Sequence, residues 1–348
     1  MKHSYTGVTV GHKIMLGATM EYRNGEFMLV DAFKLSRQGS LREDCKRFIT
    51  HFSLEGANLA VAAVSERRDQ LMVTPSLSRF ETSDLIKWQM NDYVEWPEEY
   101  YFYDFVIEDM PEDMKRDGDA EQQLVYVVAL PKKVVTELAT GILEGRGHLE
   151  IIDFFPGALM RRYVEHKGSV LALVGQHFIE VTGWYRHMCV CKKVVPIEGG
   201  AFQSALDYIE NELFEYGIPG ICGIALFKTD TIDTFYTEET PAPELDKVMD
   251  IVNTYEPLTP IPYTISSKQG SKYGESKYAG MRCSDEKRSE KKYLDKNDSD
   301  KNYSDRNYSD NKQSMITQPM VDEIAQSDPL LWDMALGMAI RGLYRPTY

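Results

Sequence analysis

The stretch "TGVTVGHKIMLGATMEY", from Thr6 to Tyr22, consists of two runs of alternating apolar residues on either side of a turn that begins at Gly11. Alternation with a period of two is typical of β-strands, so the stretch predicts a β-hairpin. Hairpins of this outline hold a phosphate when the turn supplies an Asp, a Gly and small hydroxyl side chains. The residues at these turn positions are Thr9, Gly11, His12 and Lys13.

A βββαβα order of elements begins with this hairpin and occurs twice along the chain. The first copy continues with a strand near 26–33, a helix near 40–52 and a buried strand at 57–64. The second copy has two or three consecutive strands at 169–195, a helix near 201–216 and a strand at 221–230. Two such halves that face a cleft describe an α/β protein with a two-lobed actin-like fold, which is related to ribonuclease H.

The predicted domain organisation follows from these two copies and from one segment of unusual composition. Residues 266–314 contain no Val, Ile, Phe or Trp, and their second half repeats every five residues, so they cannot bury enough apolar area to fold. We read them as a disordered low-complexity insertion, with partner binding by its tyrosines as the alternative. The predicted segments are the first lobe at 1–75, an inserted small α+β subdomain at 76–150, the return to the first lobe at 151–167, the second lobe at 168–265, the insertion at 266–314 and C-terminal helices at 315–348.

Composition narrows the classes of partner. The formal net charge of −15 argues against nucleic acid and anionic lipid as main partners. No apolar window of about 18 residues exists, so we expect no direct membrane insertion. Five scattered cysteines are typical of reduced thiols in a cytosol. Cys189 and Cys191 would share one face of a regular strand, but no second pair completes a metal site, and we expect buried thiols and no metal.

Three stretches resemble one known family. The run "YVEWPEEYYFYDF" (residues 93–105) is similar to the pattern Y-I-P-F-P-x-E-E-x-x-x-D-F, with matches at Tyr93, Val94, Trp96, Pro97, Glu98, Glu99, Asp104 and Phe105. Further on, Asp153, Ala158, Leu159 and Arg161 fit the pattern V-D-V-x-x-x-A-L-x-R, and "ALGMAIRGL" (residues 335–343) is similar to a closing helix A-L-G-L-A-L-R-G-L. All three patterns are those of the PilM family of type IV pilus assembly proteins, which this chain resembles over most of its length.

The resemblance implies a function as well as a fold. It implies an actin-like cytoplasmic protein, peripheral to the inner membrane, in a type IV pilus or a related type II secretion-like machine. Its implied partner is a PilN-like single-pass inner-membrane protein, which docks through its cytoplasmic N-terminal tail in a groove beside the inserted subdomain. Other proteins of the pilus motor platform are further implied partners.

Nucleotide binding is where this chain departs from the family pattern. PilM-like ATPases hold ATP with three glycine-bearing loops, and a carboxylate in the first two serves the metal. Here Thr9 and Leu173 stand at those carboxylate positions, and the third loop, aligned with 224–233, lacks glycine. The degenerate loop positions are Thr9, Gly11, His12, Lys13, Leu173, Gly175, Gln176 and His177.

We therefore predict a scaffold without catalytic residues or cofactors, a pseudo-ATPase in an actin-like fold. ATP with Mg²⁺ remains the alternative cofactor, and two alternative functions follow. The first is a nucleotide-binding ATPase switch in the same machine, in which Lys13 meets a phosphate. The second is a sugar kinase-like enzyme of the same fold, which needs a catalytic Asp that we cannot place. The alignment also predicts that His12 and His177 face one another across the cleft.

A dense group of aromatic residues provides the candidate partner surface. The candidates are Trp88, Tyr93, Trp96, Tyr101, Tyr103 and Phe105. In a strand, Tyr101, Tyr103 and Phe105 share one face, and Phe102 and Asp104 belong to the other. One face would form an aromatic groove of the kind enriched at interfaces, and an acidic groove would suit a tail with basic residues. The alternative is that these rings fill the core of the small subdomain.

Overall fold

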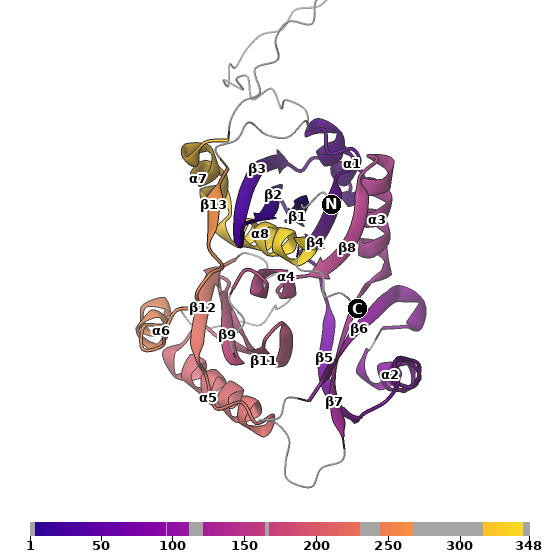
Figure 1. The fold of residues 1–348 in the computed structure, drawn as a ribbon. Helices are drawn as coiled ribbons and strands as arrows, with labels where there is room; N and C mark the ends of the chain where they lie inside the picture. Colours follow the sequence, from indigo (N-terminus) through magenta and orange to yellow (C-terminus); the bar gives the residue numbers. More distant parts are fainter. Residues whose placement is uncertain are drawn as a thin grey trace, which may run out of the picture.

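The computed structural model describes residues 4–94, 96–110, 121–163, 167–229, 244–266 and 316–343. The predicted disordered insertion lies outside the described residues, except for its first residue, Ser266. The described residues form two lobes and an inserted subdomain (Figure 1), with the second lobe and the subdomain side by side below the first lobe in that view.

The first lobe is built on a six-stranded sheet with the order β13-β3-β2-β1-β4-β8. Its strands are β1 (Ser4–Val10), β2 (Ile14–Arg23), β3 (Glu26–Ser36), β4 (Asn58–Ala63), β8 (His148–Phe154) and β13 (Tyr263–Ile265). Helices α1 (Leu41–His51) and α3 (Lys132–Glu144) share one apolar core on one face of the sheet. A capping box at Ser40 fixes the start of α1, as expected for a Ser followed three residues later by Glu.

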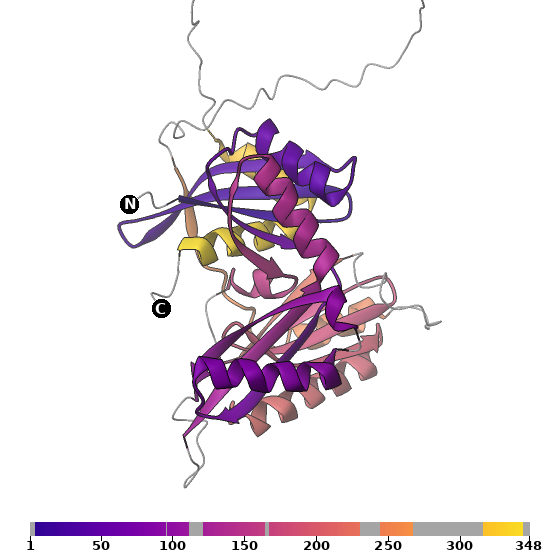
Figure 2. The same cartoon turned by 90° about the vertical axis from the view of Figure 1, so that its right-hand side faces the viewer.

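Helix α8 (Pro329–Leu343) covers the opposite face of the same sheet and contacts β1, β2 and β4. The approach is so close that a Cβ atom on Gly7 would lie 1.9 Å from the carbonyl oxygen of Ala335, so only glycine fits there. The short helices α4 (Gly157–Met160) and α7 (Gln318–Ser327) also contact α8. The C-terminal segment thereby completes the first lobe (Figure 2).

The second lobe repeats the plan of the first with a four-stranded sheet in the order β11-β10-β9-β12. Its elements are β9 (Lys167–Val174), β10 (Phe178–Tyr185), β11 (Met188–Pro196), α5 (Gly199–Glu215), β12 (Gly223–Lys228) and α6 (Leu245–Val252). As in the first lobe, the first strand pairs antiparallel with the second and parallel with the fourth. Helix α5 is the helix predicted near 201–216, and its apolar side chains at helical spacing are buried: Phe202, Leu206, Ile209 and Leu213.

The inserted subdomain is a three-stranded antiparallel sheet in the order β5-β7-β6, covered by one helix. Its elements are β5 (Arg68–Pro75), α2 (Arg79–Tyr93), η1 (Glu98–Tyr100), β6 (Tyr101–Asp109) and β7 (Gln122–Pro131). Figure 2 shows α2 lying along the outside of this sheet. The core between them contains Ile86, Met90, Val125 and Val127.

Sheet pairing corrects the predicted domain boundaries. The strand β5 pairs with β7, so it belongs to the insertion and not to the first lobe. Strand β8 pairs with β4, and α3 packs on α1, so both belong to the first lobe; the insertion runs from β5 to β7 and not over 76–150. Strand β13 pairs with β3 at the edge of the first lobe, although 263–265 were assigned to the second. Local patterns indicate strands, but they do not specify the partner of a strand.

A β-bulge corrects the expectation for the two neighbouring cysteines. In the pairing of β10 with β11, Gly183 stands opposite Cys191 and Trp184 stands opposite Cys189, with a register shift between them. Adjacent residues of β10 point to opposite faces, so the two cysteines do as well, and the shared face expected for a regular strand is lost. Within the described ranges no cluster of three or more His, Cys, Asp or Glu residues could hold a metal ion.

Candidate functional site

Helix α8 packs against the buried side of the turn between β1 and β2. Thr9 is fully buried, and its hydroxyl donates a hydrogen bond of 2.8 Å to the carbonyl oxygen of Leu331. A Cβ atom on Gly11 would lie 2.4 Å from Cδ1 of Leu331, so that leucine occupies the space beside the glycine. His12 and Lys13 are exposed at the tip of the turn. The position of the expected carboxylate is therefore part of the packing between strand and helix.

The turn between β9 and β10 also has a buried, uncharged residue at the position of the expected carboxylate. Leu173 is fully buried in the core, and the amide of Gly175 donates to the carbonyl of Phe178 at 2.8 Å. Gln176 and His177 are exposed. We call this turn and the β1–β2 turn the two glycine turns. The facing of His12 and His177 across the cleft stays a prediction, and the third aligned loop lies outside the described residues beyond Thr229.

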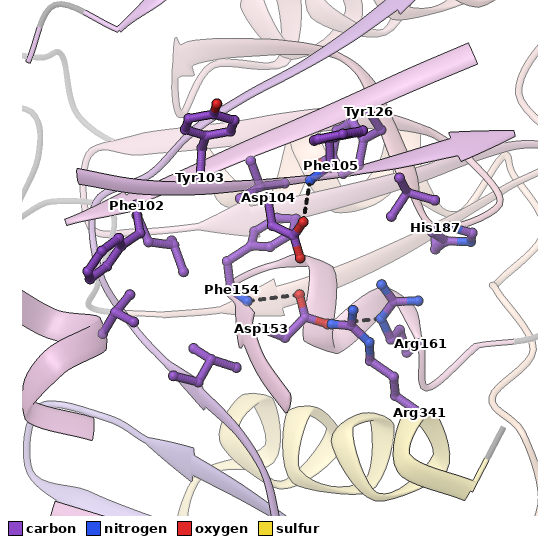
Figure 3. Close-up of a pocket in the computed structure, with 15 residues that line it drawn as sticks. Phe102, Tyr103, Asp104, Phe105, Tyr126, Asp153, Phe154, Arg161, His187 and Arg341 are labelled. Atoms are coloured by element: carbon purple, nitrogen blue, oxygen red, sulfur yellow. Dashed lines mark hydrogen bonds and ion pairs between the residues drawn. The ribbon is translucent and has the colours of Figure 1, made fainter. Parts of the chain in front are cut away.

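A cavity of about 280 Å³ lies where the two lobes and the inserted subdomain meet, and we call it the junction pocket. Figure 3 shows strands of the subdomain on one side and α8 of the first lobe on the other. Its apolar and aromatic lining comes from β6, β7, α3 and β8: Phe102, Tyr103, Phe105, Val106, Tyr126, Val128, Leu130, Val135, Ile152 and Phe154. Its polar lining is Asp104, Asp153, Arg161, His187 and Arg341.

One buried carboxylate holds two guanidinium groups at the floor of this pocket. Asp153 is 4% exposed; its Oδ2 accepts a hydrogen bond from Nε of Arg161 at 2.9 Å and forms an ion pair with Nη1 of Arg341. Its Oδ1 accepts from the backbone amide of Phe154. Burial alone would raise the pKa of Asp153, but the Arg341 and Arg161 guanidiniums outweigh it and lower that pKa. The carboxylate is therefore ionised, and both of its oxygens have donors.

Two further ionisable groups line the pocket, one from the subdomain and one from the second lobe. Asp104 is exposed on β6, and its Oδ1 accepts from the amide of Phe105 at 2.8 Å. His187, in the β10–β11 turn, lies 3.3 Å from a carboxylate oxygen of Glu108. Burial first, and then the nearby arginines, lower the pKa of His187 to about 3, so the imidazole is neutral at neutral pH. The lining thus has two carboxylates and two guanidiniums, which is not the acidic groove that we expected.

A buried ionic network fastens the subdomain to the second lobe behind the pocket. Arg67 is 7% exposed, and its guanidinium lies 3.0 Å from Glu180 on β10 and 3.1 Å from Asp69 on β5. The hydroxyl of Tyr126, which also lines the pocket, donates to Asp69 at 2.9 Å. This wall of the pocket is therefore held in place by ion pairs that join β5 of the subdomain to β10 of the second lobe.

The predicted aromatic candidates gather mainly on the other face of β6. Tyr101 is buried in the subdomain core, and Tyr103, Phe105 and Trp96 pack against that core. This is the arrangement expected if the rings fill the core of the subdomain, but Tyr103 and Phe105 also line the junction pocket. Figure 3 shows Tyr103 pointing away from Asp153. Trp88 is 70% exposed on α2. Tyr93 ends α2, and its side chain lies outside what the structure describes.

The list of candidates contains Tyr103 and Phe105 of the pocket lining, and the polar residues at the floor, Asp153, Arg161 and Arg341, are among those that it missed. Phe102 and Asp104 were missed as well; the period of β6 places them on the face opposite Tyr101, and both line the pocket. Asp153, Arg161 and Arg341 belong to two of the stretches that carry the family resemblance, which was the available signal. Their convergence requires the chain from 153 to 341 to fold back on itself, and no local pattern encodes that.

No family model and no curated protein matches the chain. Among solved structures, it superposes on a chain of the PilM-PilN type IV pilus biogenesis complex with a TM-score of 0.56 and 12% identity, over 98% of this chain and 99% of that chain. The fold is actin-like. The cytoplasmic domain of EpsL, an inner-membrane component of the type II secretion system of Vibrio cholerae, gives a TM-score of 0.42 at 10% identity over 76% of this chain and 90% of that domain.

The likeness to the PilM-PilN structure bears on the fold, since the identity is low. It confirms the predicted two-lobed actin-like architecture over nearly the full length of both chains. The two glycine turns are then equivalent positions of the two lobes, because each joins the first two strands of its sheet. Among the helices that the structure describes, none has the length and apolar character needed to cross a bilayer.

Proposed function

We propose that this protein is a PilM-like cytoplasmic scaffold of a type IV pilus or a related type II secretion-like machine, peripheral to the inner membrane. It docks the cytoplasmic N-terminal tail of a PilN-like single-pass membrane protein and does not hydrolyse ATP. The observation that carries the proposal is the full-length likeness of its fold to a chain of a PilM-PilN complex. The family resemblance of the motifs supports the same assignment.

The junction pocket is the docking site in this proposal. It lies beside the inserted subdomain, which is where the resemblance puts the tail, and its apolar walls suit aliphatic side chains of a peptide. Phe102 is 44% exposed at its wall, and Nζ of Lys132 lies 5.0 Å from the centre of its ring. Aromatic residues, phenylalanine included, are enriched at protein interfaces relative to the rest of the surface.

The proposal that this protein does not hydrolyse ATP is based on the residues at the two glycine turns. A bound Mg²⁺ needs carboxylate oxygens to balance the phosphate charge, and Thr9 and Leu173 provide none. Both side chains are fully buried in packing, and the hydroxyl of Thr9 is used by Leu331. The fold is therefore retained as a platform for docking without the groups that would hold the metal.

The direct test is a titration of the full chain with a synthetic peptide. The peptide carries the N-terminal cytoplasmic tail of a PilN-like single-pass membrane protein from the same genome, and a scrambled peptide of the same composition is the control. We expect saturable binding of the tail peptide alone. Equal binding of both peptides, or binding of neither, would refute the docking function.

A further inference from the structure

We infer that a second cavity, between α2 and β5 of the subdomain, binds a short aliphatic carboxylate with a neutral N–H or O–H donor on the carbon beside its carboxyl group. The volume of this cavity is about 90 Å³, and we call it the edge pocket. The inference does not rest on the proposed function, because the edge pocket is separate from the junction pocket.

The subdomain sheet lies between the two pockets. On β7, Val128 lines the junction pocket and its neighbour Val127 lines the edge pocket, and adjacent residues of a strand point to opposite faces. Lys192, on β11 of the second lobe, also lines the edge pocket, and β5 contacts β11. A ligand of the edge pocket would therefore contact both the subdomain and the second lobe.

The apolar part of the edge pocket has room for a small aliphatic group. Met72 and Met90 are flexible side chains that can adapt to the shape of such a group. A cavity of about 150 Å³ holds a six-carbon ring, so this volume corresponds to roughly four carbon atoms, the size of a leucine side chain. The apolar lining comes from β5, α2, the residue after α2, and β7: Met72, Ile86, Met90, Val94 and Val127.

One buried polar atom of the lining lacks a hydrogen-bond partner. Gln89, on α2, lines the edge pocket, and its Oε1 is buried without a partner among the residues that the structure describes. A buried acceptor in this state destabilises the protein, and a donor supplied by a ligand would remove the cost. The ligand therefore needs an N–H or O–H group next to its aliphatic part.

The charged residues of the lining favour an anionic ligand. Asp69 is paired with Arg67, whose Nε lies 3.1 Å away, and Arg68 forms an exposed pair of 3.1 Å with Glu66. Lys192 is exposed and forms no ion pair within the described ranges, so it is available to a carboxylate. An ammonium group of the ligand would be repelled by Lys192 and Arg68, so the donor is neutral.

Two kinds of ligand share this chemistry. The C-terminal leucine of a polypeptide has a backbone N–H, a carboxylate and a four-carbon side chain, and N-acetyl-leucine represents it. A free 2-hydroxy acid has a hydroxyl group in place of the amide, and 2-hydroxy-4-methylpentanoate represents it. The relative affinities of these two compounds distinguish the sources.

The first experiment changes only the ligand, so folding of the protein is not affected. Both compounds are titrated into the full chain, and binding is followed by ligand-observed NMR. The controls are 4-methylpentanoate, which lacks the donor, and N-acetyl-leucine amide, which lacks the carboxylate. We expect saturable binding of at least one compound and about tenfold weaker binding of both controls. No saturable binding, or equal binding of a control, would overturn the inference.

The second experiment assigns the binding to the edge pocket. Lys192→Gln should weaken binding of the tighter compound about tenfold. Lys193→Gln is the matched control on the same strand and should bind normally, because Nζ of Lys193 lies 5.1 Å from the centre of the Tyr208 ring on α5. Gln89→Leu removes the acceptor and should bind 4-methylpentanoate and its 2-hydroxy form with equal affinity. Thermal unfolding reports whether each variant folds.

The outcomes of the variants decide the assignment. Unchanged affinity in folded Lys192→Gln would overturn the inference, and so would a folded Gln89→Leu that still prefers the ligand with the donor. If Gln89→Leu does not fold, the ligand series and the two lysine variants still decide. Failure of the tail-peptide titration would refute the docking function and leave this inference in place, because the edge pocket does not take part in docking.

Discussion

The two glycine turns and the junction pocket differ in whether charged side chains occupy their shielded positions. At the glycine turns, positions where a metal site needs carboxylates hold Thr9 and Leu173, and the first turn of α8 fills the space with Leu331. At the junction pocket, an aspartate and two arginines are kept under partial or complete burial, which costs desolvation energy. This difference is expected under the proposed function, in which docking uses the junction pocket and no metal is held at the glycine turns.

The largest expected effect is at the floor of the junction pocket. Asp153→Ala leaves two shielded guanidiniums without their carboxylate and should lower the free energy of unfolding by about 3–5 kcal/mol. Urea denaturation measures this. Asp84→Ala is the control, because its pair with Lys87 is exposed and should contribute below about 1 kcal/mol. A loss of under 1 kcal/mol for Asp153→Ala would mean that the floor is solvated and the pocket is not a built site.

A smaller loss is expected when the carboxylate is restored to the first glycine turn. Thr9→Asp places an acceptor against the carbonyl oxygen of Leu331 in a fully buried position, and should cost about 3 kcal/mol. Thr9→Val, which only removes the hydrogen bond, should cost about 1 kcal/mol. Chemical denaturation of both variants tests this order. A stable Thr9→Asp variant that gains affinity for Mg²⁺·ATP would show that the turn is still a nucleotide site.

Stability should depend on pH through His187. Its pKa is lowered to about 3 in the folded chain by burial, Arg161, Arg341 and Arg186, against the opposing charge of Asp153, while Glu108 lies 3.3 Å away. The unfolded chain takes up the proton near pH 6.5, so stability from this group is present at higher pH and is lost as pH falls toward 3.

Between pH 7.5 and pH 5 this loss should amount to about 2 kcal/mol. His187→Gln removes the titrating group and should remove that part of the pH dependence. Denaturation curves of the two proteins at both pH values give the difference. Identical pH dependence in the variant would show that His187 is not shielded at the junction.

The smallest expected effect on stability accompanies a clear effect on binding. Phe102→Ala removes an exposed ring from the pocket wall, so it should change the unfolding free energy little and weaken tail binding about tenfold, or about 1.4 kcal/mol. Phe214→Ala on α5, where the ring is 71% exposed, is the matched control and should bind normally. Equal affinities would place the docking surface elsewhere.

Much of the fold could be predicted from local pattern. The first hairpin, predicted from its period of two, and the helix predicted near 201–216 are present as expected, and the duplicated order indicated two lobes. The partner of β5 could not be predicted, because alternation is the same for every possible neighbour. The bulge opposite Gly183 was also hidden, since one extra residue in β11 leaves no mark in composition.

The candidate site was predicted less well, for a related reason. The aromatic run of β6 indicated an important strand, but burial of Tyr101 under α2 depends on where that helix packs. The pocket depends on side chains as distant in sequence as Asp153 and Arg341, and such contacts are a property of the tertiary fold. The sequence indicated the loss of the carboxylates directly, because a missing residue type needs no structure to be seen.

The central claim is that docking at the junction pocket does not depend on nucleotide. The most direct measurement is the affinity of the tail peptide for the full chain, by calorimetry, with and without millimolar ATP and Mg²⁺. The account predicts dissociation constants that agree within about twofold and no saturable heat from ATP alone. A tenfold or larger change in peptide affinity on adding ATP would contradict it, since the cleft would then still act as a nucleotide switch.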